Sequence, residues 1–160
     1  MDFFEVVYNR RSVRQFRSDP VDKEVVLKIL DAANWAPTGM RMQQWEFIVV
    51  TGEKKQQLGD SYGIIGEAYA KDWDQASRDA FVEYARTYGG APMIVVVLTE
   101  ASDISPIRKM HLESASAAME NLVLAARALE LGTCWMTGPL QDNETIRNIL
   151  DIPMDKEIVA

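Results

Sequence analysis

The chain has 160 residues, of which 48% are apolar and 26% charged, so it is long enough for one domain with a substantial core. Acidic residues outnumber Lys and Arg by 24 to 17, and the net charge of -7 argues against nucleic acid or an anionic membrane as a partner. The single cysteine, Cys134, and the single histidine, His111, exclude an intramolecular disulfide and argue against a Cys/His zinc site.

No targeting or membrane segment is visible in the sequence. The chain begins MDFFE, with acids where a signal peptide carries basic residues. The longest apolar run, at residues 93–98, has the length of a strand and is much shorter than a bilayer span. Together with the single free cysteine, these features predict a cytoplasmic protein.

Capping residues and hydrophobic spacing predict two helices at the start of the chain. Asp2 caps a helix that runs through Asn9. Asp22 caps a second helix, which Pro37 stops. The residues between these helices are too densely charged to form a core element.

The rest of the chain predicts strands and helices in an irregular order. In sequence these are a strand at 45–51, helices at 52–62 and 69–88, a strand at 93–98, a long helix at 106–132, a strand at 133–136, a helix at 143–150 and a strand at 156–160. Small residues at 114–118 indicate that the long helix is buried. Because strands and helices do not alternate strictly, we expect an α+β fold.

Conventional catalytic motifs are scarce. Neither a P-loop nor the glycine motif of dinucleotide-binding folds is present. His111 stands near the start of the long helix, which favours a surface or helix-end histidine over a catalytic one. Cys134 lies in an apolar run with no neighbouring base, which favours a buried, inert thiol.

One basic segment contrasts with the acidic chain. Residues 10–17 carry four arginines, and no acid lies between Asn9 and Ser18. The planar fork of arginine matches phosphate oxygens, and Ser12 adds a hydroxyl donor. This segment is therefore either a phosphate cradle or a solvated basic loop.

Two further segments are rich in proline, glycine and small polar residues. Residues 35–45 connect a helix to a strand, and glycines bracket the apolar residues of segment 132–139. Each is either an ordinary connection or a place where backbone donors approach a flat ligand. With the basic segment, they favour a protein that holds a reactive cofactor.

These three segments resemble motifs of the FMN-dependent nitroreductase family. Residues 10–16, RRSVRQF, are similar to its R-R-S-x-R-x-F signature. Residues 36–47 are similar to its A-P-S/T-x-x-N-x-Q-P-W-x-F loop, and residues 132–138 to its G-x-x-W/P-x-x-G strand. The order and spacing also agree, and the resemblance covers essentially the whole chain.

The resemblance implies a homodimer of α+β subunits with a central, mostly antiparallel sheet packed between helices, and one FMN at each end of the interface. The phosphate and ribityl chain would be held by Arg10, Arg11, Ser12 and Arg14. The partner subunit would line the isoalloxazine ring with Pro37, Thr38, Gly39, Met40 and Arg41, a loop that Gln43 supports. The other ring face would be covered by Trp135, Met136, Thr137 and Gly138, with the backbone of Thr137 and Gly138 near flavin N5.

The implied activity is a ping-pong transfer of hydride from NAD(P)H to nitroaromatic, quinone or similar small aromatic acceptors. No side chain of the motifs acts as a catalytic acid or base. Two other interpretations stay open. One is a branch with different flavin chemistry, such as reductive dehalogenation or flavin breakdown, for which residues 64–88 are the candidate substrate lid. The other is a non-catalytic flavin-binding dimer.

The chain departs from the family pattern at three places. Arg41 stands where the family usually has Asn, and Gln44 stands where it usually has Pro. The family also continues past the last strand with a G-Y-P segment and a basic pair, which do not occur before Ala160. We therefore expect residues 1–160 to form a single FMN-binding domain that lacks the family's C-terminal tail.

Overall fold

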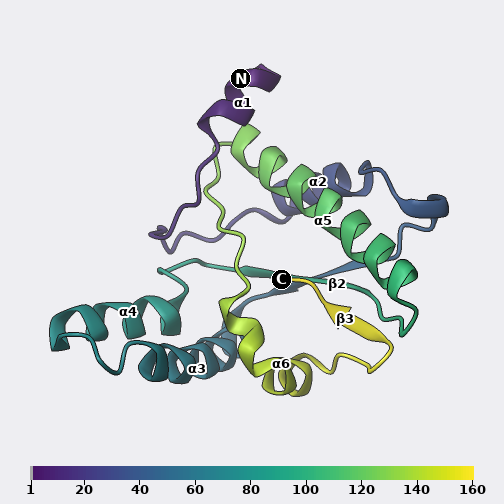
Figure 1. The fold of residues 1–160 in the computed structure, drawn as a ribbon. Helices are drawn as coiled ribbons and strands as arrows, with labels where there is room; N and C mark the ends of the chain where they lie inside the picture. Colours follow the sequence, from purple (N-terminus) through teal and green to yellow (C-terminus); the bar gives the residue numbers. More distant parts are fainter. Residues whose placement is uncertain (1) are drawn as a thin grey trace.

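The computed structural model describes residues 2–160 (Figure 1). Its helices are α1 (Phe3–Asn9), α2 (Lys23–Asn34), α3 (Gly52–Tyr69), α4 (Gln75–Thr87), α5 (Ser105–Ala128) and α6 (Asn143–Leu150). Its strands are β1 (Trp45–Val50), β2 (Ile94–Glu100) and β3 (Lys156–Ile158). Short 3-10 helices, η1 (Gly39–Arg41) and η2 (Gly138–Asp142), precede β1 and α6. The fold is α+β, as expected.

The three strands form one antiparallel sheet in the order β1–β2–β3. Trp45 of β1 lies opposite Thr99 of β2, and the two strands pair along the whole length of β1. β3 pairs only with the end of β2, where Ile158 lies opposite Leu98. Residues 96–99 of β2 are all buried because helices cover both faces of this central strand.

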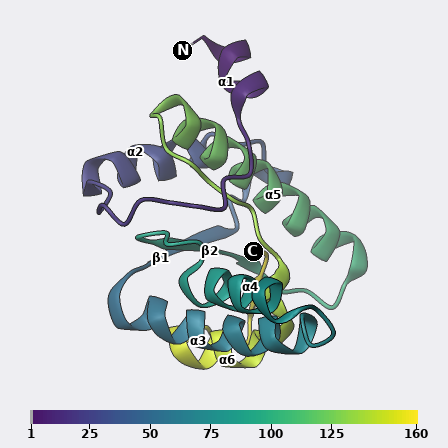
Figure 2. The ribbon, with the colours of Figure 1, turned by 90° about the vertical axis from the view of Figure 1, so that its left-hand side faces the viewer.

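Helices α2 and α5 cover one face of the sheet, and α3, α4 and α6 cover the other (Figures 1 and 2). On the first face, Ala33 of α2 and Ala115 and Ala118 of α5 are fully buried. These small side chains let both helices approach each other and the sheet closely. The expected burial of the long helix is thereby confirmed.

On the second face, α3 packs against α4 through glycines. A Cβ on Gly59 would overlap the main-chain carbonyl oxygen of Arg86, and a Cβ on Gly66 would lie 3.2 Å from the nearest side-chain atom of α4. The close approach of α4 keeps these glycines inside a continuous helix. For this reason α3 runs to Tyr69, and the predicted helix end at Tyr62 is wrong.

The helix predicted at 69–88 is also shorter in the structure. α4 begins at Gln75, after the N-cap residue Asp74, whose carboxylate accepts a hydrogen bond from the Ser77 amide at 3.1 Å. Likewise the long helix α5 ends at Ala128, before the predicted end at Gly132.

The strand predicted at 133–136 does not form. Thr133 makes an isolated parallel bridge with Ser12, and the neighbouring residues lie outside the sheet. Apolar and β-branched residues favour a strand only where another strand runs alongside to pair with them. Within residues 2–160, no helix combines the length and the apolar character needed to cross a bilayer.

Candidate functional site

Two segments that are distant in sequence lie side by side. These are residues 10–17, here called the arginine segment, and residues 132–138, here called the tryptophan segment. The Val13 amide donates a hydrogen bond to the Thr133 carbonyl oxygen at 2.9 Å. The Phe16 amide donates to the Gly89 carbonyl oxygen at 2.8 Å. These bonds hold the arginine segment in place beside the tryptophan segment.

The arginine segment presents its positive charges to solvent. Arg10 Nε lies 3.9 Å from Glu120 Oε1 of α5, and both side chains are partly exposed. Arg11 Nη1 donates to two main-chain carbonyls at 2.7 and 2.8 Å, and Arg14 Nη1 reaches the Ser12 carbonyl oxygen at 3.4 Å. Because a guanidinium carries five N–H donors, each arginine keeps donors free for an anion.

The tryptophan segment combines an exposed ring with main-chain amides. Trp135 is 41% exposed, and Thr137 is the N-cap residue of η2. Gly138 packs against Tyr62 so closely that an added Cβ would lie 3.1 Å from the tyrosine hydroxyl oxygen. Glycine at this position therefore lets the segment lie against Tyr62, three residues from the exposed Trp135 ring.

Two tyrosines, one from α3 and one from α4, contact the tryptophan segment. Tyr84 Oη donates to Met136 Sδ at 3.7 Å. Burial raises the pKa of Tyr62, and nearby Tyr84 and Cys134 raise it further. Burial also raises the pKa of Tyr84. Both hydroxyls are therefore protonated at neutral pH, where they can donate hydrogen bonds but cannot act as bases.

Neither tyrosine belongs to a motif, so sequence reasoning missed both. Tyr84 falls within the predicted lid at residues 64–88, whereas Tyr62 precedes it. Their position behind the tryptophan segment depends on the packing of α3 against α4. Only the tertiary structure reveals this contact.

A third segment, residues 37–43, lies apart from the first two and is here called the methionine loop. It packs on α5, where the Gly39 amide donates to Ser114 Oγ at 3.1 Å. Figure 1 shows this loop beyond the end of α2 at the right, whereas the chain that follows α5 descends left of centre. Across residues 2–160, no hydrogen bond joins the methionine loop to either segment. One chain therefore brings together two of the three predicted parts of the site.

The methionine loop has a strained backbone. Met40, Arg41 and Gln43 have φ angles of 53°, 58° and 47°. This left-handed conformation costs about 1 kcal/mol or more for each non-glycine residue. Gln43 Nε2 donates to the Asn34 carbonyl oxygen at 2.9 Å and ties the loop to the end of α2. Met40 is 83% exposed, so the strained loop projects its side chains away from the chain that holds it.

Comparison with known proteins decides the family. A sequence model described as the nitroreductase family matches residues 7–160. The chain belongs to the nitroreductase family. Its family identifies it as an oxidoreductase, in agreement with the resemblance of its three segments.

Relatives of this nitroreductase-family chain have several names. A protein of Methanothermobacter thermautotrophicus, named as a candidate NADH dehydrogenase/NAD(P)H nitroreductase, is 32% identical over 96% of this chain and 71% of its own length. The 5,6-dimethylbenzimidazole synthase of Rhodospirillum rubrum is 30% identical over 94% of this chain and 75% of its own length.

Solved structures confirm the nitroreductase-like fold. The nitroreductase of Bacteroides fragilis with bound FMN has a TM-score of 0.75 and 27% identity, covering 99% of this chain and 84% of its own. A family protein from Clostridium novyi has a TM-score of 0.78 and 26% identity, covering 100% of this chain and 82% of its own. Iodotyrosine deiodinase bound to FMN and 3-iodo-L-tyrosine shares the fold at 22% identity, with a TM-score of 0.79 and coverage of 98% and 85%.

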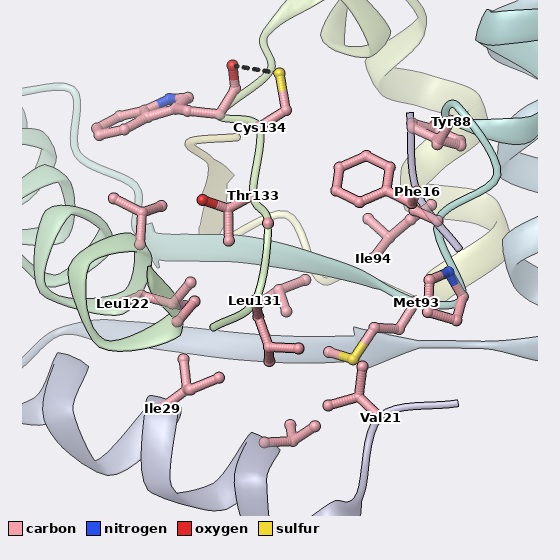
Figure 3. A pocket seen from close by; sticks show the side chains of 18 of the residues that line it. Phe16, Val21, Ile29, Tyr88, Met93, Ile94, Leu122, Leu131, Thr133 and Cys134 are labelled. Atoms are coloured by element: carbon pink, nitrogen blue, oxygen red, sulfur yellow. Dashed lines mark hydrogen bonds between the residues drawn. The ribbon is translucent and has the colours of Figure 1, made fainter. Parts of the chain in front are cut away.

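This nitroreductase-family chain also contains a cavity of about 540 Å³ behind the tryptophan segment (Figure 3). Apolar side chains from α2, β2, α5 and adjoining segments line it, among them Phe16, Val21, Ile29, Met93, Leu122 and Leu131. Of the predicted flavin-contacting residues, only Trp135 and Met136 reach its wall. Because the lining is mainly apolar, this cavity is not the place for a phosphate.

Two expectations about reactive side chains are wrong. His111 is not at the surface: only 3% of it is exposed, and its Nδ1 lies 2.9 Å from the Glu100 carbonyl oxygen, because α5 packs this residue against the end of β2. Cys134 is only half-buried, because it lies in an irregular segment instead of a core strand. The described residues contain no cluster of three or more His, Cys, Asp or Glu side chains that could hold a metal ion.

Proposed function

We propose that this chain is an FMN-dependent oxidoreductase that passes hydride from NADH or NADPH to nitroaromatic, quinone or similar small aromatic acceptors in a ping-pong cycle. The observation that carries the proposal is the contact between the arginine segment and the tryptophan segment. It supports the proposal because arginine donors, which suit a phosphate, lie beside a segment with an exposed aromatic ring, which suits a flat ligand. The solved relative with bound FMN supports the same cofactor.

In this proposal the arginine segment holds the phosphate and ribityl chain. The residues concerned are Arg10, Arg11, Ser12 and Arg14. The free guanidinium donors of the three arginines and the hydroxyl of Ser12 fit a phosphate group, and a hydrogen bond to a charged group contributes about 1.5–3 kcal/mol. The rest of the chain is acidic, so this segment is the local exception that attracts an anion.

The tryptophan segment forms one wall of the ring site. Its contributors are Trp135, Met136, Thr137 and Gly138, with the backbone amides of Thr137 and Gly138 near flavin N5. Bound FMN supplies the hydride chemistry, and the chain binds, orients and shields it. The hydroxyls of Tyr62 and Tyr84 beside this wall are protonated at neutral pH, as tyrosines ordinarily are, and burial raises the pKa of both further.

The opposite wall comes from a second copy of the chain. Its contributors are Pro37, Thr38, Gly39, Met40 and Arg41, in the loop that Gln43 ties to α2. Because the methionine loop lies apart from the arginine segment of its own chain, a homodimer is the arrangement that lets both line one flavin. Exposed Phe3, Phe4 and Met40 supply apolar surface for this contact. Each subunit then acts as one FMN-binding domain, and we place the protein in the cytoplasm.

Flavin titration followed by anaerobic reduction tests the proposal. The purified chain is expected to bind FMN and turn yellow, to lose its colour with NADH or NADPH under nitrogen, and to regain it with a quinone. Double-reciprocal plots of initial rate against the concentration of one substrate, at several fixed concentrations of the other, are expected to give parallel lines. A chain that binds no FMN contradicts the proposal, and a yellow chain that neither pyridine nucleotide reduces supports a non-catalytic flavin-binding dimer instead.

A second candidate function rests on the relative named 5,6-dimethylbenzimidazole synthase, which is 30% identical. In that case the chain would break down reduced flavin. Analysis of the products formed from reduced FMN in air distinguishes the two functions. Intact FMN supports the reductase, whereas a new benzimidazole product supports the second function.

A further inference from the structure

A buried amide supports the methionine loop from below. Gln44 follows the loop directly, and only 5% of the residue is exposed. Its Oε1 accepts a hydrogen bond from Thr38 Oγ1 at 3.0 Å. The same hydroxyl oxygen accepts a hydrogen bond from the Gln43 amide at 3.0 Å. The Thr38 hydroxyl therefore joins the two ends of the loop, and Gln44 Oε1 at 3.0 Å is a nearer acceptor for its proton than the Gly39 carbonyl oxygen at 3.4 Å.

The orientation of this hydroxyl follows from its single proton. A threonine hydroxyl donates one hydrogen bond and accepts through its lone pairs. When the proton points to Gln44, the lone pairs are free to face the Gln43 amide. That amide belongs to a residue with a φ of 47°, so the bond restrains one of the strained positions of the loop.

The other end of the Gln44 side chain has no partner. Within residues 2–160, its buried Nε2 makes no hydrogen bond, and an unpaired buried donor destabilises the folded state. The main chain of Gln44 is fixed independently, because its carbonyl oxygen accepts from the Glu100 amide and from Thr99 Oγ1, each at 3.2 Å. An apolar side chain of similar size would fill the same space without an orphan donor. The bond to Thr38 is what an apolar replacement could not supply.

We infer that Gln44 is a positioning residue for the methionine loop: its side-chain carbonyl orients the Thr38 hydroxyl, which holds Gln43 in its left-handed conformation. The loop then projects Met40 and Arg41 in a fixed arrangement toward the flavin of a partner subunit. This inference rests on the proposed function. A loop that is already ordered loses less conformational freedom on binding, so Gln44 increases flavin affinity at the expense of stability.

Gln44→Met tests the inference. Methionine is similar in length to glutamine, but its sulfur is a weak acceptor for the Thr38 hydroxyl, and it has no buried amide that would remain without a partner. We expect three results. The melting temperature without FMN stays the same or rises. The Gln43 amide hydrogen exchanges faster. The Kd for FMN increases about five- to tenfold, the loss expected for one hydrogen bond.

Two further variants make the result specific. Thr99→Val is the matched control. It removes another buried hydroxyl that donates to Gln44, but this hydroxyl bonds the main-chain carbonyl oxygen of Gln44 and not its side chain. Its Kd for FMN and its Gln43 exchange are expected to match the wild type. Thr38→Val breaks the same contact from the other side. The double variant with Gln44→Met is expected to bind FMN no more weakly than Thr38→Val alone, because both residues act through one hydroxyl.

Each outcome decides the inference. Unchanged Gln43 exchange in Gln44→Met overturns it, whatever happens to the melting temperature. Faster exchange with an unchanged Kd also overturns it, since the loop would then not need this restraint to meet the flavin. If the wild-type chain binds no FMN, the proposed function fails, and the exchange rate still decides whether Gln44 positions the loop.

Discussion

Glu120 faces Arg10 across 3.9 Å, measured from Oε1 to Nε, so an exposed ion pair holds the first arginine of the arginine segment above α5. Exposed pairs of this kind contribute at most about 1 kcal/mol. A hydrogen bond from the same guanidinium to a phosphate contributes more, about 1.5–3 kcal/mol. The carboxylate therefore does not compete strongly with an anion for Arg10.

Replacing Arg10 and Arg14 together by Ala is expected to weaken FMN binding roughly a hundredfold or more, because two charge-assisted hydrogen bonds are lost. The fold is expected to survive, since both side chains make few contacts with the rest of the chain. Fluorescence titration of FMN gives the Kd, and circular dichroism reports the fold.

Two single variants control for the change in charge. Arg17→Ala removes a positive charge from an exposed side chain at the end of the segment and is expected to leave the Kd for FMN within about threefold. Glu120→Gln releases Arg10 and is expected to leave FMN binding unchanged or slightly tighter. An unchanged Kd in the double arginine variant would refute the phosphate cradle.

Mixing two defective variants tests the shared site. Gly39→Val is expected to displace the methionine loop, because a Cβ there would collide with Met110. Mixed with the double arginine variant, it forms heterodimers in which one of the two sites has an intact arginine segment and an intact loop. About one site in four is then expected to regain tight FMN binding after random exchange of subunits. No recovery in a mixture shown by native mass spectrometry to contain heterodimers would mean that each site belongs to one chain.

The bond between Ser61 and Asp142 predicts how stability depends on pH. Ser61 Oγ donates to Asp142 Oδ2 at 2.8 Å, and this bond, with those from Thr145, lowers the pKa of Asp142. A carboxyl whose pKa is lowered by folding stabilises the native state at neutral pH, and the effect is lost as the pH falls through the folded pKa. Ser61→Ala is expected to reduce the free energy of unfolding by about 1–2 kcal/mol near neutral pH.

Urea denaturation of both proteins at several pH values checks this. The difference in free energy of unfolding between wild type and Ser61→Ala is expected to be constant above about pH 5 and to shrink below about pH 4. Ser18→Ala, a control at an exposed serine, is expected to have the same free energy of unfolding as the wild type at every pH. A loss from Ser61→Ala that is equally large in acid would show that packing, and not the carboxylate, explains it.

Close packing between α3 and α4 predicts which glycine variants lose more free energy of unfolding. Gly59→Ala is expected to reduce the free energy of unfolding by about 1–3 kcal/mol, because the added Cβ would overlap a main-chain carbonyl oxygen that cannot move away easily. Gly66→Ala meets a side-chain atom at 3.2 Å and also gains helix propensity, so its loss is expected to be smaller. Thermal unfolding gives the ranking, and equal losses would contradict it.

The α+β fold class and the family were predicted correctly from the sequence, because the three motif segments are local patterns. The sites where prediction failed depend on contacts between distant residues. The helix predicted to end at Tyr62 continues through Gly63 and Gly66 to Tyr69, where α4 packs closely against these glycines. Thr133 lies in an apolar run, but only Ser12 pairs with it, so no strand forms.

The same reasoning explains what was missed at the candidate site. His111 was expected at the surface or at a helix end because it stands near the start of the long helix, whereas the carbonyl oxygen of Glu100 gives it a buried partner. In the sequence, Gln44 was only a departure from the family pattern, at a position where the family usually has Pro. Its role in the loop becomes visible only when the hydroxyl of Thr38 is seen between Gln43 and Gln44.

The bonds that fix the arginine segment also set an order of assembly. Val13 bonds to Thr133 and Phe16 bonds to Gly89, so the arginine segment, although it is early in the chain, can take its final position only after these later residues are in place. Contacts between such distant residues form slowly, because a long loop must close before they can be made. The arginine segment is therefore expected to be among the last parts of the molecule to take shape during synthesis, so the proposed cofactor would bind only to a chain whose core is already in place.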